Sequence, residues 1–455
     1  MAGIFGTDGV RSRINTGPMR AEFIVRLALA AGEYFIAKND SYHKSTKPIV
    51  VIGKDTRLSG YMLEAALVSG FTSIGMDCRL TGPIPSAGVA YLSAVVSYLS
   101  HSLRAELGVM ISASHNPHFD NGIKLFGPDG FKLEDDIELE ISNLLQGSIS
   151  LAEPESLGRA RRMIDSVARY VEFAKAKFSP QLSLDSLKIV VDCANGAAYK
   201  TAPETLRELG AHVIPISVEP DGLNINAKCG ATSPQNLVRE VKNHNADIGI
   251  ALDGDADRLI LCDERGELHD GDSVLAALAL EMHHSGTLRG PVVGTLMTNL
   301  GLERFFQENN IPFNRSNVGD RYILESLKRD GGNLGGEPSG HILLPEITRC
   351  GDGLIAALKI LELLVKNQKS ASALLHLCTS IPQKLVNLSN IDNAVLQKDT
   401  VVNEVEKIKN KLGDKGRILL RPSGTEPVIR IMVEAEDAVL VDKTINELSE
   451  ILKNN

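Results

Sequence analysis

Residues 248–258 read Ile-Gly-Ile-Ala-Leu-Asp-Gly-Asp-Ala-Asp-Arg, an apolar run followed by three aspartates at alternate positions. The run Ile248–Leu252 has the length and composition of a strand that is buried on both faces of a sheet. Gly254 keeps the following loop tight, so the three carboxylates can converge on one hard divalent cation, and without an ion they would repel one another. We therefore predict a metal site formed by Asp253, Asp255 and Asp257 at the carboxyl end of a buried strand.

This acidic loop has two alternative interpretations. An EF-hand would place Glu264 at its twelfth position, but Arg258 stands at the sixth position, where that motif needs glycine, and the flanking segments resemble strands. A solvated acidic turn without any ion is the simpler alternative, although alternate aspartates seldom end a buried strand by accident. The metal site is therefore the favoured hypothesis.

Apolar runs of this kind alternate along the chain with longer segments that carry apolar residues at helical spacing. Further strands are predicted at 48–52, 107–111, 187–191 and 291–296, and helices at 157–176, 234–243 and 273–283. This alternation is typical of α/β proteins. Ligands of open α/β sheets bind beyond the carboxyl ends of the strands, so the polar loops that follow these strands are the expected place for chemistry.

The length of 455 residues predicts about three domains of ordinary size. The spacing of the elements suits three successive α/β blocks of similar size followed by a smaller one. Polar junctions near 146–154, 263–272 and 367–373 separate these blocks. The predicted domains are therefore 1–153, which contains a serine loop at residues 112–117, 154–265, which contains the acidic loop at residues 253–258, 266–370 and 371–455.

The composition excludes several classes of protein. The chain has 48 Lys and Arg against 57 Asp and Glu, a net charge of −9, and only 4% aromatic residues, whereas nucleic-acid binding needs a basic surface and usually aromatic stacking platforms. The six cysteines are widely spaced, which argues against a zinc site or a disulfide framework. No uncharged apolar stretch reaches about 18 residues, and no signal-peptide pattern opens the chain. We expect a soluble cytoplasmic protein that binds neither nucleic acid nor membranes.

A second candidate site is the segment Ser112-Ala113-Ser114-His115-Asn116-Pro117, which follows a predicted strand and precedes Lys124. A nucleophilic Ser-His couple would need His115 to reach Ser114, but adjacent side chains of an extended segment point to opposite faces. Ser112 and Ser114 would share one face. The residues alone leave open whether a serine here is chemically active or the segment is a polar turn.

Two glycine-containing loops add further polar groups. Residues 421–427, Arg-Pro-Ser-Gly-Thr-Glu-Pro, combine an arginine and two hydroxyls and could bind an anion together with Arg430. Residues 335–341, Gly-Gly-Glu-Pro-Ser-Gly-His, offer a carboxylate, a hydroxyl and an imidazole that suit the hydroxyls of a sugar. Each loop, taken alone, could also be an ordinary turn.

These four loops, in this order, resemble the α-D-phosphohexomutase superfamily over nearly the whole chain. The segments at 5–11, 224–226, 229–232, 298–303 and 318–322 are similar to the branch of that superfamily that acts on glucosamine phosphates. The chain departs from this branch at Pro338, where glutamine is more usual, and at Arg349 and Cys350, where a smaller polar pair is expected. The resemblance implies three similar mixed-sheet α/β domains and a smaller C-terminal α+β domain around a central cleft.

The resemblance also implies roles for individual residues. Ser114 would be the phosphorylated serine, and Asp253, Asp255 and Asp257 would hold one Mg²⁺ that also touches the serine phosphate. The other implied site residues are Arg11, Lys124, Arg258 and His341 at the catalytic centre, Glu337 and Ser339 on the sugar, and Arg421, Ser423, Gly424, Thr425 and Arg430 on the phosphate that is not reacting. Lys124 and His341 are the candidates for proton transfer, with no choice made between acid and base.

The implied reaction interconverts glucosamine 6-phosphate and glucosamine 1-phosphate through a phosphoserine enzyme and a glucosamine 1,6-bisphosphate intermediate. It would supply UDP-N-acetylglucosamine and peptidoglycan precursors, and it requires phosphorylation of Ser114. The expected partner is a small sugar phosphate, and the expected assembly is a homodimer. The alternatives are a phosphomannomutase or phosphoglucomutase with the same machinery, and a non-catalytic sugar-phosphate-binding protein.

Overall fold

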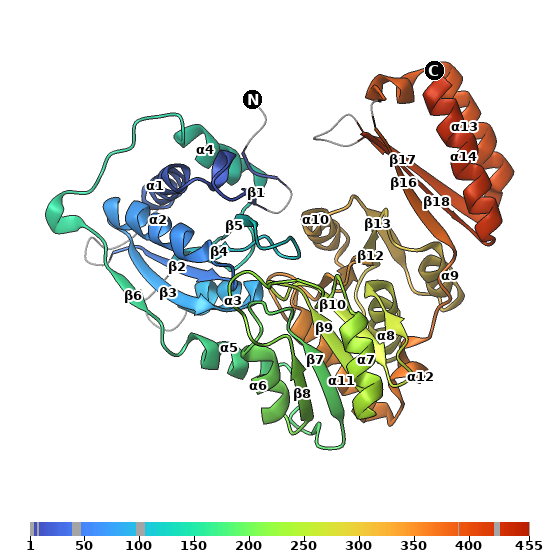
Figure 1. Ribbon diagram of the computed structural model, residues 1–455, viewed down its shortest axis with the longest axis horizontal. Coiled ribbons are helices and arrows are strands. Elements are labelled where there is room, and N and C mark those ends of the chain that lie inside the picture. Colours follow the sequence, from blue (N-terminus) through green and yellow to red (C-terminus); the bar gives the residue numbers. More distant parts are fainter. Residues whose placement is uncertain are drawn as a thin grey trace.

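The computed structural model describes residues 4–6, 9–38, 47–96, 105–389, 391–422 and 428–454. Four sheets follow one another along this part of the chain, as Figure 1 shows. The first three, with six, five and four strands, are mixed and carry helices, whereas the fourth has three antiparallel strands. The predicted architecture of three α/β units and a smaller C-terminal α+β unit is confirmed.

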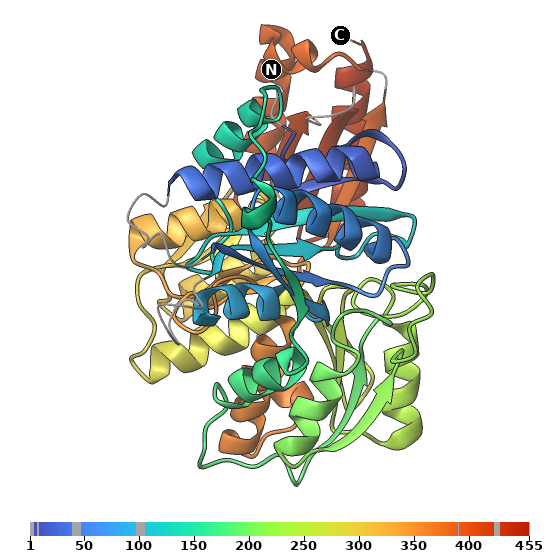
Figure 2. The ribbon, with the colours of Figure 1, turned by 90° about the vertical axis from the view of Figure 1, so that its left-hand side faces the viewer.

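The first sheet has the strand order β1-β5-β4-β2-β3-β6 and lies between two layers of helices. Its strands are β1 (Val10–Arg13), β2 (Ile49–Lys54), β3 (Asp77–Pro83), β4 (Ala105–Ile111), β5 (Asp120–Phe126) and β6 (Ala160–Arg162), and its helices are α1 (Ala21–Ala37), α2 (Gly60–Ser73), α3 (Ser86–Val96) and α4 (Asp135–Leu144). On β2, Val50 and Ile52 pack in the core with residues of α1 and α2, and Val51 packs in the core with residues of α3. Figure 2 shows α1 and α2 on one side of this sheet and α3 on the other. Burial on both faces explains why the first four residues of β2 are apolar.

The second sheet, ordered β11-β10-β9-β7-β8, carries the acidic loop. Its elements are α5 (Ser166–Lys175), β7 (Lys188–Asp192), α6 (Thr201–Glu208), β8 (His212–Ile216), α7 (Gln235–His244), β9 (Ile248–Leu252), β10 (Leu259–Asp263) and β11 (Leu268–His269). Strand β9 is buried throughout, pairs in parallel with β7 and antiparallel with β10, and has the predicted bounds. Its central place in the sheet explains its unbroken apolar run.

The predicted helix over 157–176 is wrong in its first part. Ala160–Arg162 forms β6, which pairs in parallel with β3, and helix α5 begins only at Ser166. Gly158 disfavours a helix, and a Cβ at that position would lie 1.8 Å from the carbonyl oxygen of Met76. Close approach of the two backbones therefore decides in favour of a sheet edge.

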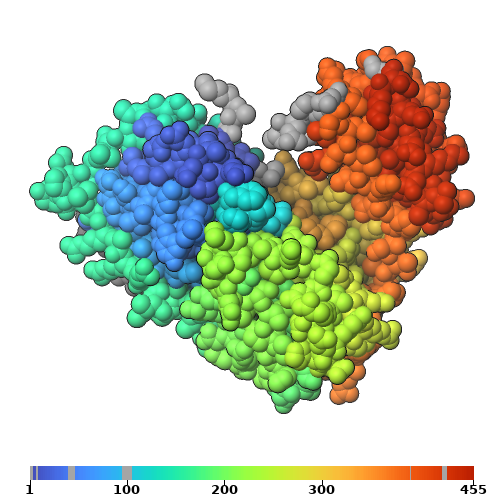
Figure 3. Space-filling view, in the orientation of Figure 1, coloured from blue at the N-terminus to red at the C-terminus, as the bar shows by residue number. Residues whose placement is uncertain are grey.

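The third and fourth sheets complete the chain. The third sheet has the strand order β13-β12-β14-β15. Its strands are β12 (Val292–Thr295), β13 (Phe313–Ser316), β14 (Gly335–Gly336) and β15 (Ile342–Leu343), and the helices of its unit are α8 (Gly271–His284), α9 (Leu300–Glu308), α10 (Asp320–Asp330), α11 (Gly353–Asn367) and α12 (Ala371–Leu375). The fourth sheet consists of β16 (Gln383–Ser389), β17 (Gly416–Pro422) and β18 (Val428–Ala435), and the helices of its unit are α13 (Asp399–Leu412) and α14 (Ala438–Asn454). Figure 3 shows the surface hollowed between the first sheet's unit and this C-terminal unit.

The described residues bear on two features that the sequence argues against, a membrane-spanning segment and a disulfide framework. In the described ranges, no helix is long and apolar enough to span a membrane. All six cysteines are described, and none of them forms a disulfide.

Candidate active site

The serine loop and the acidic loop meet where β4 and β9 end. The hydroxyl of Ser114 donates a hydrogen bond to Asp253 Oδ2 at 2.6 Å, and both residues are buried. One carboxylate oxygen from each of Asp253, Asp255 and Asp257 lies within 4.8 Å of the others. The structure therefore brings together the serine and the three aspartates that the sequence analysis selected.

The acidic loop has the donor set of a hard-cation site. Asp255 Oδ2 accepts hydrogen bonds from Ser86 Oγ at 2.6 Å and Lys124 Nζ at 2.8 Å, and Lys124 also reaches Asp257 Oδ2 at 3.0 Å. Among the described residues, Asp255 Oδ1 and Asp257 Oδ1 are buried without a hydrogen-bond partner. Carboxylate oxygens are the ligands that Mg²⁺ and Ca²⁺ prefer, so these residues fit such an ion.

Both alternative interpretations of the acidic loop are wrong. The loop joins strands β9 and β10 rather than two helices, and the three aspartates are buried rather than solvated. Burial, together with repulsion from Asp257 and Asp255, raises the pKa of Asp253 to about 8. Burial also acts to raise the pKa of Asp257, but the positive charges of Lys124 and His341 hold it well below its ordinary value.

Ser114 adopts an unusual backbone conformation. Its φ of 50° lies in the left-handed region, which costs a residue other than glycine about 1–2 kcal/mol. The segment is therefore not extended, and His115 Nδ1 lies 3.2 Å from Ser114 Oγ. The prediction that these two side chains point apart is wrong. Burial and the nearby charges of Arg258 and Arg11 lower the pKa of His115 to about 4, so its ring is neutral at pH 7.

Cationic groups surround the acidic loop. Lys124 lies on β5, and Arg258 forms an isolated antiparallel bridge with His341. His341 Nδ1 lies 3.7 Å from Asp257 Oδ1, and its Nε2 lies 3.6 Å from Asp320 Oδ2. Burial favours the neutral ring, but these two carboxylates prevail and raise the pKa of His341 to about 9. His341 is therefore protonated at pH 7, and it could donate a proton.

Arg11, Glu337 and Ser339 lie in segments next to this centre. Arg11 Nη1 donates to Asn116 Oδ1 at 3.4 Å, beside the serine loop. Glu337 Oε1 accepts a hydrogen bond from the backbone N–H of Gly319 at 2.9 Å, and its Oε2 accepts one from Ser339 Oγ at 3.2 Å. The loop between β14 and β15 thus presents a fixed carboxylate and a hydroxyl beside His341.

The structure describes only part of the predicted phosphate loop. Ser423, Gly424 and Thr425 lie outside the described residues. Arg421 on β17 stands directly opposite Arg430 on β18, and Arg430 Nε is buried with no hydrogen-bond partner in the described part of the chain. Burial and the charge of Arg430 lower the pKa of Arg421. Like charges that face each other on neighbouring strands destabilise a sheet, and a bound anion would offset this repulsion. The pair of arginines is therefore suited to bind an anion.

Sequence reasoning missed several residues that contact the centre: Asp55, Arg57, Ser86, Asn226 and Asp320. Asp55 directly follows β2, so its position at the end of a buried strand was a usable signal. Asp320 begins α10 and accepts a hydrogen bond from Lys132 as well as facing His341. No local pattern in the sequence marks that contact.

Known protein families match most of the chain. The families described as phosphoglucomutase/phosphomannomutase match at residues 2–150 (alpha/beta/alpha domain I), 168–266 (domain II), 270–381 (domain III) and 384–451 (C-terminal domain). A phosphoglucomutase/phosphomannomutase family protein from Burkholderia thailandensis has the same fold, with a TM-score of 0.81 at 22% identity over 99% of this chain and 97% of its own.

Curated relatives are much more similar in sequence. The phosphoglucosamine mutase of Phenylobacterium zucineum is 52% identical over 98% of this chain and 97% of its own length. That of Granulibacter bethesdensis is 51% identical over 99% of this chain and 96% of its own length. The chain therefore belongs to the phosphoglucosamine mutase family within the phosphoglucomutase/phosphomannomutase superfamily.

Proposed function

We propose that this chain interconverts glucosamine 6-phosphate and glucosamine 1-phosphate by way of phosphorylated Ser114 and an enzyme-bound glucosamine 1,6-bisphosphate. The observation that carries the proposal is the buried hydroxyl of Ser114 at 2.6 Å from Asp253, inside the triad of carboxylates. The family membership supports glucosamine as the sugar. The proposed setting is the cytoplasm, where the product would feed UDP-N-acetylglucosamine and peptidoglycan precursors, with a sugar phosphate as partner and a homodimer as the assembly.

Moving a phosphoryl group between O6 and O1 of one sugar requires a group that lends a phosphoryl and takes one back. Phosphorylated Ser114 transfers its phosphoryl to the free sugar hydroxyl, and the bisphosphate then turns round and returns the other phosphoryl to Ser114. Mg²⁺ held by Asp253, Asp255 and Asp257 would offset negative charge on the transferring group. Lys124 and His341 are the proposed groups for moving the proton of the sugar hydroxyl.

The same reaction needs a second site that accepts the phosphate at either end of the sugar. Arg421 and Arg430, with Ser423, Gly424 and Thr425, are proposed to hold that phosphate. Glu337 and Ser339 are proposed to bind sugar hydroxyls, while Arg11 and Arg258 line the reacting end. Movement of the C-terminal unit toward the first would exclude water during transfer and allow the intermediate to turn round when the units separate.

Turnover of three substrates at equal concentration tests the proposed function. We expect the phosphate of glucosamine to give a higher kcat/KM than the phosphates of glucose and mannose. Preference for glucose or mannose phosphate would support the phosphoglucomutase or phosphomannomutase alternative. Binding without turnover of any of the three would support a non-catalytic binding protein.

Asp255→Asn should weaken Mg²⁺ binding about tenfold or more, because the number of ligand charges sets the affinity of a carboxylate site. Calorimetric titration of the unphosphorylated enzyme with Mg²⁺ measures this. Glu264→Gln is the matched control, since Glu264 lies outside the acidic loop, directly after strand β10, and accepts a hydrogen bond from Ser372 instead. Equal Mg²⁺ affinity in Asp255→Asn and the wild type would contradict the assignment of the metal site.

Arg421→Ala should weaken substrate binding about tenfold or more, because a charge-assisted hydrogen bond contributes roughly 1.5–3 kcal/mol and about 1.4 kcal/mol is a factor of ten. Free bisphosphate should also accumulate in the medium, which chromatography of the reaction mixture detects. Lys384→Ala is the control. Lys384 lies on β16 of the same sheet, and its replacement removes only an exposed ion pair with Asp442 of α14. Normal substrate affinity with no released bisphosphate in Arg421→Ala would mean that the second phosphate is held elsewhere.

A further inference from the structure

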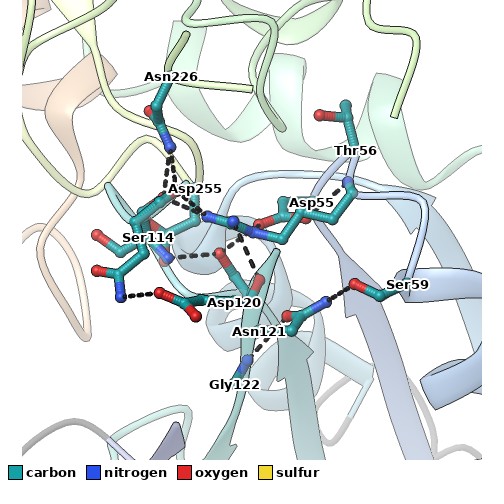
Figure 4. A network of polar contacts seen from close by, with 12 residues as sticks. Asp55, Thr56, Ser59, Ser114, Asp120, Asn121, Gly122, Asn226 and Asp255 are labelled. Carbon is teal, nitrogen blue, oxygen red and sulfur yellow. Dashed lines mark hydrogen bonds and ion pairs between the residues drawn. The ribbon is translucent and has the colours of Figure 1, made fainter. Parts of the chain in front are cut away.

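Arg57 is a buried arginine that holds the backbone of the serine loop. Its Nη2 donates to the carbonyl oxygens of Ser114 and Asn116, each at 2.9 Å. Its Nη1 donates to the carbonyl oxygens of Pro117 and Asp120, the latter at 3.1 Å. One guanidinium group therefore fixes four peptide carbonyls around the turn that carries Ser114. Figure 4 shows this polar network, with Ser114 and Asp120 of the turn labelled.

Asp55 connects Arg57, through Ser112, to the backbone N–H of Ser114. Its Oδ2 accepts hydrogen bonds from Arg57 Nε and from Ser112 Oγ, both at 2.7 Å. The hydroxyl of Ser112 in turn accepts the backbone N–H of Ser114 at 2.9 Å. Both peptide groups of Ser114 are thus held by hydrogen bonds that lead back to one buried ion pair, in which neither side chain is exposed to solvent.

Asn226 reaches the same two carbonyls from the loops of the second sheet, as Figure 4 shows. Its Nδ2 donates to the carbonyl oxygen of Ser114 at 2.9 Å and to that of Asn116 at 3.1 Å. Each of these oxygens therefore accepts two donors, which uses both of its lone pairs and fixes the direction of the peptide plane. The backbone of Asn226 is itself left-handed, with a φ of 56° and its N–H bonded to the carbonyl oxygen of Ala194 at 2.9 Å.

We propose that Arg57 and Asn226 are positioning residues for phosphoryl transfer at Ser114, an inference that rests on the function proposed above. Both contact the backbone of the serine loop, so they act through Ser114 rather than on the substrate. They hold Ser114 in the left-handed conformation that directs its hydroxyl at Asp253. Because Arg57 lies in a loop of the first unit and Asn226 in a loop of the second, the two donors also fix the serine loop relative to the acidic loop.

Asn226→Ala and Arg57→Lys test this inference in the full-length enzyme phosphorylated on Ser114. We expect the rate at which glucosamine 6-phosphate discharges the phosphoserine to fall about tenfold or more, because small misplacements of reacting groups cost large factors in rate. The KM should change by less than about threefold. Amide hydrogen exchange of the unphosphorylated protein should become faster at Ser114, whose N–H depends on this network.

Asn333→Ala is the matched control, because the buried Asn333 amide also donates to a carbonyl oxygen, that of Thr287 at 2.9 Å, in the third unit. It should lower the melting temperature without changing the discharge rate. If the wild-type phosphoenzyme is discharged and Asn226→Ala is discharged at the same rate, the positioning role is wrong while the proposed function stands. If glucosamine 6-phosphate does not discharge the wild type, the proposed function fails and the positioning role fails with it. Should Arg57→Lys not fold, the Asn226→Ala result decides.

Discussion

Ser114→Ala is expected to abolish mutase turnover, because the substitution removes the hydroxyl that we propose as the carrier of the phosphoryl group. Alanine leaves the fold intact, since Ser114 lies in a loop after β4 and its backbone N–H and carbonyl keep their partners. Steady-state turnover and the intact mass of the protein measure the outcome. No phosphorylated species of this variant should appear at any substrate concentration.

Ser112→Ala is the control for this result. Ser112 has the same side chain two residues earlier. Its hydroxyl bonds to Asp55 and to the backbone N–H of Ser114, and not to an aspartate of the acidic loop. We expect it to accept a phosphoryl group and to retain measurable turnover. Equal failure of both variants to accept phosphate would show that Ser114 has been wrongly chosen as the carrier.

Gly254→Ala is expected to lower phosphoryl transfer about a hundredfold, because a displacement of the reacting groups by about 1 Å costs that much. A Cβ at Gly254 would lie 2.5 Å from the carbonyl oxygen of Ser114 and 2.8 Å from Asn226 Nδ2. The backbone must therefore shift, and the flanking Asp253 and Asp255 must shift with it. The single-turnover rate of phosphoserine discharge and the Mg²⁺ affinity should both fall.

Gly147→Ala controls for the general effect of replacing a glycine. A Cβ at that position would meet only the carbonyl oxygen of Leu144, at the ordinary distance of 3.7 Å. This variant should transfer phosphoryl groups at the wild-type rate. A Gly254→Ala enzyme as active as Gly147→Ala would contradict the close stacking of the two loops.

The elements predictable from the sequence are those whose signal is local. Strand β9 has its predicted bounds because its burial on both faces demands an unbroken apolar run. The convergence of Asp253, Asp255 and Asp257 follows from their alternate spacing in a loop tightened by glycine. The general division into three α/β units and a smaller one likewise follows from the alternation of elements, while the predicted boundaries after 153, 265 and 370 stay a proposal.

What the sequence alone could not predict depends on contacts between distant segments. The edge strand β6 replaces the first part of a predicted helix because Gly158 packs against the backbone at Met76. The contact of His115 with Ser114 depends on the left-handed φ of Ser114, which a general rule for extended segments does not anticipate. The network of Arg57 and Asn226 joins residues more than 50 and 100 positions from the serine loop.

The mass of the enzyme before and after mixing with substrate tests the central claim most directly. Enzyme that carries one phosphoryl group on Ser114, located by peptide mapping, is mixed with glucosamine 6-phosphate and Mg²⁺ in a single turnover. We predict that the protein loses the mass of one phosphoryl group while an equal amount of glucosamine 1,6-bisphosphate appears. Interconversion of the sugar phosphates with the phosphoryl group retained on Ser114, or carried on another residue, would contradict the account.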